Sequence, residues 1–400
     1  MFSGYEPELL ADLTGRWQRI QRDLAQADAD AILLATNMNL FYVSGRVYSG
    51  FAYVARDEVP VFFVRRPVGL SGARTHSIRR MEEIPELLAS HGIPSPRRLM
   101  LEDGEIPYTE WLRFSQAFPG VETVAGGSHL MRMRRAVKTP WEIRQVEAGG
   151  SLQGAAFADF PSIFRPGMTD QEFNIAIFAE MLRRGNLGVI RASGYTMENF
   201  VGSVLAGENG GGVSPFDFAL GGAGWCRALP VGQCGAVIRR GDAVMCDIPG
   251  NLNGYMSDCT RTFSYGPLVP RAYEAHQCSI EIESAIAAAG VPGASCEALY
   301  LMSLEMAEKA GFADCFMGLK QKAKFVGHGT GLYVNELPVL CKRSPDVLEE
   351  GMVIAVEPKF VIEGAGAVGV EDTYVVTPNG LRCLSESPRG IVDLETGKRT

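Results

Sequence analysis

The chain has 400 residues, of which 46% are hydrophobic and 21% charged, so it is long enough for two or three globular domains and shows no bias toward disorder. Its 38 basic and 46 acidic residues give a formal net charge of −8, which argues against broad nucleic-acid binding or attachment to an anionic membrane. No stretch approaches the roughly 18 uninterrupted apolar residues of a membrane helix, and the first residues lack a basic start and apolar run typical of a signal peptide. We therefore expect a cytoplasmic protein.

The N-terminal third is typical of alternating helices and strands. Apolar residues follow helical spacing from 9 to 26, and short apolar runs at 31–35 and 59–64 favour buried strands. A further helix is expected around residues 84–88. In the remaining part, a long helix is predicted to begin at Pro140, and Thr169-Asp170-Gln171-Glu172 has the pattern of a capping box at the start of another helix.

Two segments of the C-terminal part share one layout, and each carries two acidic residues. In the first segment, Asp247 and Asp258 flank an Asn-Gly turn; in the second, Glu357 and Glu371 flank a Glu-Gly-Ala-Gly turn. In both, a glycine stands six residues before the first acid and a threonine two residues after the second acid. The shared layout predicts an internal duplication in which each copy is a β-hairpin.

Counting outward from the middle of each hairpin predicts that Asp247 lies opposite Asp258 and that Glu357 lies opposite Glu371. Directly opposed residues hold their Cβ atoms about 4.5–5.5 Å apart, so each pair of like charges destabilises the fold unless something neutralises it. A proton shared between two carboxylates could do so, but four acids on two related hairpins are better explained by divalent cations.

A fifth ligand candidate is His328, which lies between the two hairpins with glycine on either side, so that its imidazole is accessible. The alternative is a surface with scattered acids and a loop histidine, but acids inside apolar strands are uncommon unless they are paired or ligated. Carboxylates with one imidazole and no thiolate suit Mn, Co, Fe or Zn. The nine cysteines show no Cys-x-x-Cys spacing and are predicted to be free thiols.

These residues resemble the pita-bread metallopeptidases, the family of methionine aminopeptidase, aminopeptidase P and prolidase, with creatinase as a non-metal relative. Residues 138–143, Lys-Thr-Pro-Trp-Glu-Ile, are similar to the family's Lys-Ser-Pro-x-Glu-Ile motif, and residues 325–338 are similar to its Gly-His-Gly-x-Gly-Leu segment. The resemblance implies an α+β fold, with a pita-bread catalytic domain of pseudo-twofold duplicated halves over residues 135–400. A smaller, creatinase-type α/β domain is expected over residues 1–134.

The resemblance also implies a cofactor of two divalent metal ions and a role for each ligand. Asp247 is expected to bind one ion only, while His328 and Glu357 bind the other. Asp258 and Glu371 are expected to bridge the two ions. Glu357 is also the expected acceptor of the proton that a metal-activated water loses.

Three further positions concern the substrate. Arg46 ends a segment similar to the family's Asn-x-x-Tyr-x-x-Gly motif and is a candidate to bind a substrate carboxylate across a homodimer; an exposed loop arginine is the alternative. Val231 and Asn335 stand where family peptidases carry histidines that bind the substrate carbonyl and move protons. Val231 is therefore a candidate substrate-binding position. Asn335 is a catalytic candidate that can donate a hydrogen bond but cannot transfer a proton at neutral pH.

The sequence thus predicts a dinuclear metal-dependent hydrolase that cleaves a C–N bond in a dipeptide or another small molecule, similar to Xaa-Pro aminopeptidases and dipeptidases. A second hypothesis keeps the metal site but assigns a non-peptide zwitterion, as in relatives resembling ectoine hydrolase, or a lyase substrate. A third hypothesis is a non-catalytic binding protein on the same fold. Neither nucleic acid nor a membrane is expected as a partner.

Overall fold

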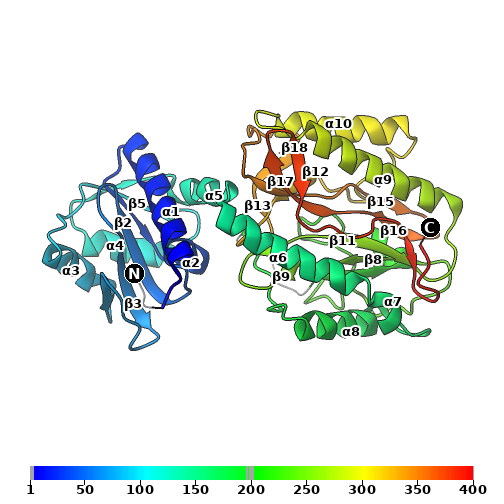
Figure 1. Ribbon diagram of the computed structural model, residues 1–400, viewed down its shortest axis with the longest axis horizontal. Helices are drawn as coiled ribbons and strands as arrows, with labels where there is room; N and C mark the ends of the chain where they lie inside the picture. Colours follow the sequence, from blue (N-terminus) through cyan, green and yellow to red (C-terminus); the bar gives the residue numbers. More distant parts are fainter. Residues whose placement is uncertain (1–3, 195–196, 198–201, 400) are drawn as a thin grey trace. The chain divides into compact units, whose positions relative to one another are not determined.

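The structure is a computed structural model that describes residues 4–194, 197 and 202–399. The chain divides into two compact units, Met1–Arg135 and Ala136–Thr400 (Figure 1). No helix among the described residues is long and apolar enough to cross a membrane. All nine cysteines are free, as the sequence predicts.

The N-terminal unit contains a mixed six-stranded sheet in the order β4-β3-β2-β1-β5-β6. The central strand β1 (Ala31–Leu34) pairs antiparallel with β2 (Ser49–Ala55) and parallel with β5 (Arg98–Leu101). The remaining strands are β3 (Val61–Arg66), β4 (Thr75–Ser77) and β6 (Glu122–Val124). The helices are α1 (Pro7–Gln26), α2 (Asn37–Ser44), η1 (Met81–Glu83), α3 (Ile84–Ser90), α4 (Tyr108–Ala117) and α5 (Gly127–Ala136).

Helices cover both faces of this sheet because successive strand residues point to opposite sides. On one face, the Trp17 ring of α1 lies 6.4 Å from the ring of Phe62 in β3. On the other face, Phe63 belongs to a core that includes Leu88 of α3 and Phe114 of α4. The helix predicted over residues 9–26 and the strands predicted at 31–35 and 59–64 correspond to α1, β1 and β3.

The C-terminal unit, which we call the catalytic unit after the domain expected there, contains two larger sheets, each built mainly from one half of the duplication. The second sheet is antiparallel, and the first is antiparallel except for its edge strand β19, which runs parallel to β11. The first has the order β19-β11-β8-β7 and the second β13-β12-β14-β17-β18. The strands of the first are β7 (Ser203–Ala206), β8 (Ala243–Asp247), β11 (Thr260–Ser264) and β19 (Val392–Asp393). Those of the second are β12 (Phe325–Gly329), β13 (Glu336–Cys341), β14 (Val353–Val356), β17 (Asp372–Thr377) and β18 (Gly380–Cys383). Two short ladders complete the hairpins: β9 (Gly250–Asn251) with β10 (Met256–Ser257), and β15 (Lys359–Ile362) with β16 (Gly366–Gly369).

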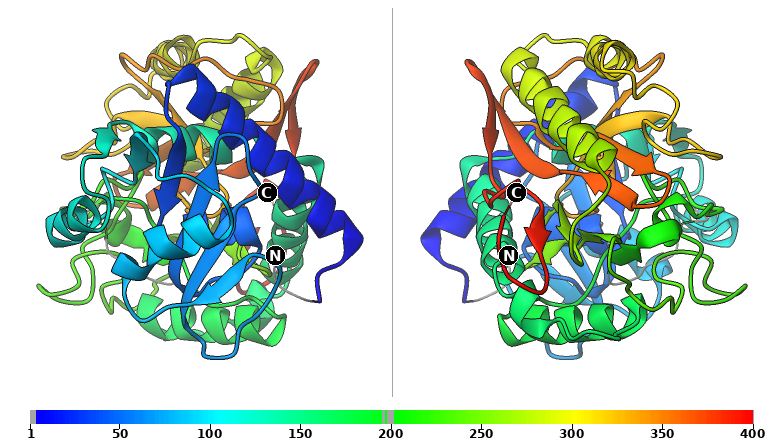
Figure 2. Two further views of the ribbon diagram at one scale, coloured as in Figure 1. Left: turned by 90° about the vertical axis from the view of Figure 1, so that its left-hand side faces the viewer. Right: turned by 90° about the vertical axis from the view of Figure 1, so that its right-hand side faces the viewer.

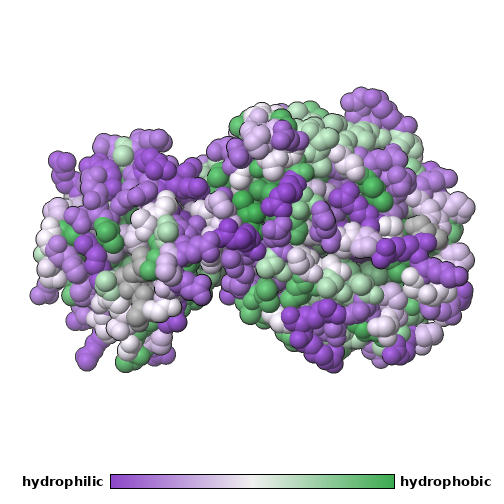
Figure 3. Space-filling view, viewed as in Figure 1, coloured by the Kyte–Doolittle hydropathy of each residue, from purple (hydrophilic) through white to green (hydrophobic). Residues whose placement is uncertain are grey.

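Helices from both halves lie outside these sheets, as Figure 1 and the right-hand view of Figure 2 show. The first half contributes α6 (Pro140–Phe157), α7 (Phe160–Ile163), α8 (Asp170–Arg183) and the short η2 (Gly207–Gly211), and the second half α9 (Pro270–Ala289) and α10 (Cys296–Lys309). The capping box at Thr169 is present and begins α8. On the face in Figure 3, hydrophilic and hydrophobic residues are mixed over the surface of each unit.

The register of the first hairpin differs from the prediction. Asp247 pairs with Thr260, and the ladder continues through Ser257 opposite Gly250, so Asp258 lies diagonal to Asp247 rather than opposite it. The reason is the position of the turn, whose centre lies one residue later than the midpoint between Asp247 and Asp258. Moving the centre of a hairpin by one residue changes the partner of every strand residue by two positions. In the second hairpin, Val356 pairs with Asp372 and Lys359 with Gly369. This register places Glu357 and Glu371 across from each other, as predicted.

The threonine that follows the second acid in each copy joins the two halves. Thr260 Oγ1 donates a hydrogen bond of 2.6 Å to Glu371 Oε2, and the backbones of the two residues exchange hydrogen bonds of 3.2 Å. In the other direction, Thr373 Oγ1 accepts a 2.7 Å hydrogen bond from Asp258 N and donates a 2.8 Å hydrogen bond to Asp258 O. The duplicated threonines therefore fix the second acid of each hairpin against the other hairpin.

Candidate metal centre

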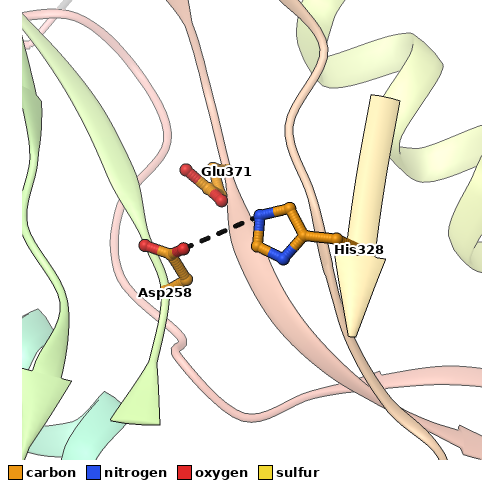
Figure 4. Close-up of side chains that lie close together, drawn as sticks. All are labelled: Asp258, His328 and Glu371. Carbon is orange, nitrogen blue, oxygen red and sulfur yellow. Dashed lines mark ion pairs between the residues drawn. The ribbon is translucent and has the colours of Figure 1, made fainter. Parts of the chain in front are cut away.

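The five predicted ligands come together in the catalytic unit from both halves of the duplication. Asp247 is the last residue of β8, and Asp258 lies between β10 and β11. His328 belongs to β12, while Glu357 and Glu371 lie just outside the adjoining ends of β14 and β17. Figure 4 shows that the side chains of Asp258, His328 and Glu371 point toward one another from separate strands and loops.

One side of the centre is built around the imidazole. His328 Nε2 lies 3.3 Å from Glu357 Oε1 and 3.9 Å from Asp258 Oδ2. One ligand atom from each of Asp258, His328 and Glu371 lies within 4.8 Å of the other two, a spacing that fits a shared ion. Nδ1 lies 3.0 Å from the carbonyl oxygen of Gly329. When Nδ1–H donates to that oxygen, Nε2 is the nitrogen left to bind a metal.

The other side of the centre contains a lysine that sequence reasoning missed. Lys359 is fully buried, and its Nζ donates to Glu357 Oε2 at 2.7 Å, to Asp247 Oδ2 at 3.0 Å and to Glu371 Oε2 at 3.0 Å. These three acids are a second group whose ligand atoms lie within 4.8 Å of one another. The signal for this residue was a lysine two positions after a predicted ligand, at the start of an otherwise apolar strand.

The pKa values of the acids shift in opposite directions, because burial and mutual repulsion raise them whereas the neighbouring cations lower them. Burial, followed by the charge of Asp247, raises the pKa of Asp258 to about 7, and burial with the charge of Asp258 raises the pKa of Glu371 well above its usual range. For Glu357, burial acts in the same direction, but Lys359 and His328 outweigh it and lower the pKa to about 2. The centre therefore contains two acids, Asp258 and Glu371, whose ionised forms its own side chains stabilise poorly.

The same acids also shift the pKa values of the two basic side chains of the centre, His328 and Lys359. Burial disfavours the imidazolium form of His328, yet Glu357 and Asp258 outweigh it and raise the pKa to about 9. Burial likewise disfavours the charged form of Lys359, but Asp247, Glu357 and Glu371 raise its pKa well above the usual range. A metal that binds His328 must therefore displace a proton, so we expect metal affinity to fall as the pH is lowered.

The residues on the His328 side fit a divalent ion. Glu371 Oε1 is buried and has no hydrogen-bond partner, although buried carboxylate oxygens are normally paired. The donor set of carboxylate oxygens and one imidazole nitrogen, without a thiolate, suits Mn, Co, Fe or Zn. On the opposite side, the Asp247, Glu357 and Glu371 oxygens that would face an ion already contact the Lys359 ammonium.

The other predicted site residues occupy different environments. Val231 is buried, with 2% of its surface exposed. The Asn335 side chain is engaged on both of its polar atoms: Oδ1 accepts from Ser193 N at 2.6 Å and Nδ2 donates to Ser193 O at 2.7 Å. Arg46 is exposed and belongs to the N-terminal unit. The functional roles predicted for these three residues stay predictions.

Comparison with known proteins identifies the family. Residues 144–378 match metallopeptidase family M24, and residues 16–137 match the creatinase/prolidase N-terminal domain. The chain belongs to metallopeptidase family M24. Membership of family M24 confirms the predictions of a hydrolase and of divalent metal ions at the level of the family. It does not define the metal or the number of ions.

Relatives can be aligned with this chain along nearly its full length. A putative dipeptidase, YkvY, from Bacillus subtilis (strain 168) is 27% identical over 398 residues, which cover 95% of this chain and 99% of that protein. An Xaa-Pro dipeptidase from Pyrococcus furiosus is 24% identical over 384 residues, which cover 94% and 99%. These relatives therefore include both the N-terminal unit and the catalytic unit.

Solved structures of similar proteins share the fold. An Xaa-Pro dipeptidase from Bacillus anthracis aligns with a TM-score of 0.77 at 23% identity, covering 95% of this chain and 99% of that chain. The prolidase from Pyrococcus horikoshii OT3 aligns with a TM-score of 0.73 at 21% identity, covering 94% and 100%. The predicted α+β pita-bread fold with a creatinase-type N-terminal domain is thereby confirmed.

Proposed function

We propose that this protein is a metal-dependent hydrolase that cleaves a C–N bond in a small substrate, with a dipeptide of the Xaa-Pro type as the first candidate. The observation that supports it most is the convergence of Asp258, His328 and Glu371, where a buried carboxylate oxygen of Glu371 has no hydrogen-bond partner. The relatives named dipeptidase and Xaa-Pro dipeptidase, which match along nearly the full chain, support a small peptide substrate.

The residues of the metal centre have different proposed roles. Asp258, His328, Glu357 and Glu371 would hold the ion, which when bound would supply a water of lowered pKa and polarise the scissile carbonyl. Glu357 is the proton acceptor, because its carboxylate is ionised and lies beside the imidazole ligand. Its hydrogen bond to Lys359 makes this carboxylate a weaker base, and efficiency as a general base falls with the pKa. The arrangement therefore favours slow rather than rapid turnover.

A second candidate keeps the metal centre but takes a non-peptide substrate, such as a cyclic amidine or another compact zwitterion. The observation that favours it lies at the two positions where family peptidases carry histidines. Val231 has no group that titrates, and both polar atoms of the Asn335 amide are held by the Ser193 backbone. Neither residue can therefore give a proton to an amine leaving group. Hydrolysis of a peptide requires this proton transfer, whereas ring-opening hydrolysis of an amidine depends on it less.

A turnover screen separates the two candidates. The protein is loaded separately with Mn, Co, Zn or Fe(II), and Ala-Pro, Gly-Pro, a non-proline dipeptide and a set of cyclic amidines are each assayed. Hydrolysis that needs metal and is lost in His328→Ala and Glu371→Gln supports the proposal. The matched control is Glu363→Gln, which removes an exposed acid from the turn of the hairpin that carries Glu371. Metal-independent hydrolysis that survives His328→Ala would refute the proposal.

A further inference from the structure

The ammonium of Lys359 lies where a second divalent ion would have to bind. Its Nζ is within 3.0 Å of one oxygen from each of Asp247, Glu357 and Glu371, the acids that form the second candidate ligand group. Divalent ions bind carboxylate oxygens at about 2.0–2.6 Å, so an ion held by these acids would have to share their oxygens with Nζ. Lysine and a second ion therefore compete for one position.

The backbone around Lys359 leaves its side chain little freedom to move away. Lys359 is fully buried at the start of β15, where it pairs with Gly369 of β16. Its carbonyl oxygen accepts a 2.8 Å hydrogen bond from Met317 N, which fixes the strand on its other edge. Nζ has three carboxylate partners and is not exposed to solvent, so displacing it would leave a buried charge without partners.

Repulsion between neighbouring cations leads to the same conclusion. The four acids carry four negative charges when ionised, and Lys359 together with one divalent ion supplies three positive charges. A second ion beside Lys359 would bring five positive charges to four negative ones, with an ammonium in contact distance of the ions. The net charge is therefore −1 with one ion and +1 with two, and this sum alone does not separate the two cases. An ammonium in contact with a divalent ion in a buried site is strongly unfavourable, however, and this repulsion acts only against the second ion.

We propose that the Lys359 ammonium takes the place of one of the two divalent cations, so that the centre holds a single ion through Asp258, His328, Glu357 and Glu371. In this arrangement Asp247 is a partner of the lysine and not a metal ligand. Lys359 thus positions Asp247, Glu357 and Glu371 as a second ion would. The proposal rests on the metal dependence proposed above, but it concerns the number of ions and needs no turnover to be tested.

Native mass spectrometry with elemental analysis counts the ions directly. After loading with excess Mn²⁺ and buffer exchange, we expect about one ion per chain for the wild type and for Lys324→Ala, which removes an exposed lysine just before β12. Lys359→Ala removes the ammonium and opens space, so its count should rise to about two. Lys359→Met removes the charge but fills the space, and its count should stay at one or below.

Electron paramagnetic resonance of the Mn²⁺-loaded wild type gives an independent readout that does not depend on any variant folding. An isolated Mn²⁺ signal is expected; the signal of an exchange-coupled pair would overturn the proposal. A wild-type count of two or of zero, or a folded Lys359→Ala variant that binds no more than the wild type, would also overturn it. One bound ion without hydrolysis of any substrate would contradict only the proposed function, and two bound ions with hydrolysis would contradict only this inference.

Discussion

Replacing Lys359 with methionine should strongly destabilise the metal-free protein. The substitution keeps an unbranched side chain of similar length but removes a fully buried ammonium with three carboxylate partners at 2.7–3.0 Å. Removing one partner of a buried ionic cluster costs about 3–5 kcal/mol, because the charges left behind are desolvated and uncompensated. We expect a loss in that range at neutral pH.

The loss should shrink as the pH falls. Without the ammonium, Glu357 loses a main cause of its lowered folded-state pKa, and the pKa of Glu371, which is already raised in the wild type, rises further. Acids with a raised folded pKa destabilise the fold increasingly as the pH rises above their unfolded values near 4, and they cost little below them. Protonation thus replaces the missing cation at low pH, and bound Mn²⁺ should partly replace it at neutral pH.

Urea unfolding in the presence of a chelator measures the effect. Circular dichroism and tryptophan fluorescence should be followed together, because a chain of two units need not unfold in one step. Lys324→Met, which removes an exposed lysine, should lie within about 0.5 kcal/mol of the wild type. If Lys359→Met costs less than about 1 kcal/mol at neutral pH, the acids are already protonated in the wild type and the reasoning fails.

Three further predictions concern metal and substrate. Asp258→Ala should abolish metal binding in elemental analysis, whereas Glu363→Gln should retain it; retained metal in Asp258→Ala would exclude Asp258 as a ligand. Activity on Ala-Pro or Gly-Pro should be about 10²–10⁴ lower than in family peptidases and should rise in Val231→His/Asn335→His, and brisk wild-type hydrolysis would contradict the assignment of those two positions. Arg46→Ala should raise KM by about tenfold with unchanged metal content if the guanidinium binds a substrate carboxylate. A monomer in sedimentation together with unaltered kinetics would rule out that role.

The sequence was most informative where a pattern was repeated. The two hairpins, their acids and His328 could be located because the same layout occurs twice and because apolar strands rarely carry unpaired acids. The pairing of Glu357 with Glu371 followed from a turn centred between them, but the same counting failed for Asp247 and Asp258. A turn that moves by one residue leaves the hydrophobic pattern intact, so the pattern could not reveal the shift.

Lys359 could not be placed from the pattern because a single lysine near a strand end is ordinary on a protein surface. Only the pairing of β15 with β16, together with the fold of both hairpins, brings Nζ to Glu371 and to Asp247, which is 112 residues away, as well as to the nearby Glu357. The contacts of Asn335 could not be predicted for the same reason, since its two hydrogen bonds go to the backbone of Ser193, 142 residues away. Contacts of this kind depend on tertiary structure, which local patterns do not contain.

The most direct test of the metal centre is a crystal structure of the Mn²⁺-loaded protein with diffraction data collected on both sides of the manganese absorption edge. The account predicts one anomalous peak per chain, bounded by Asp258, His328, Glu357 and Glu371, with Lys359 Nζ still in contact with Asp247. Absence of any anomalous peak among these residues after loading would contradict the claim that the duplicated hairpins and His328 form a metal site.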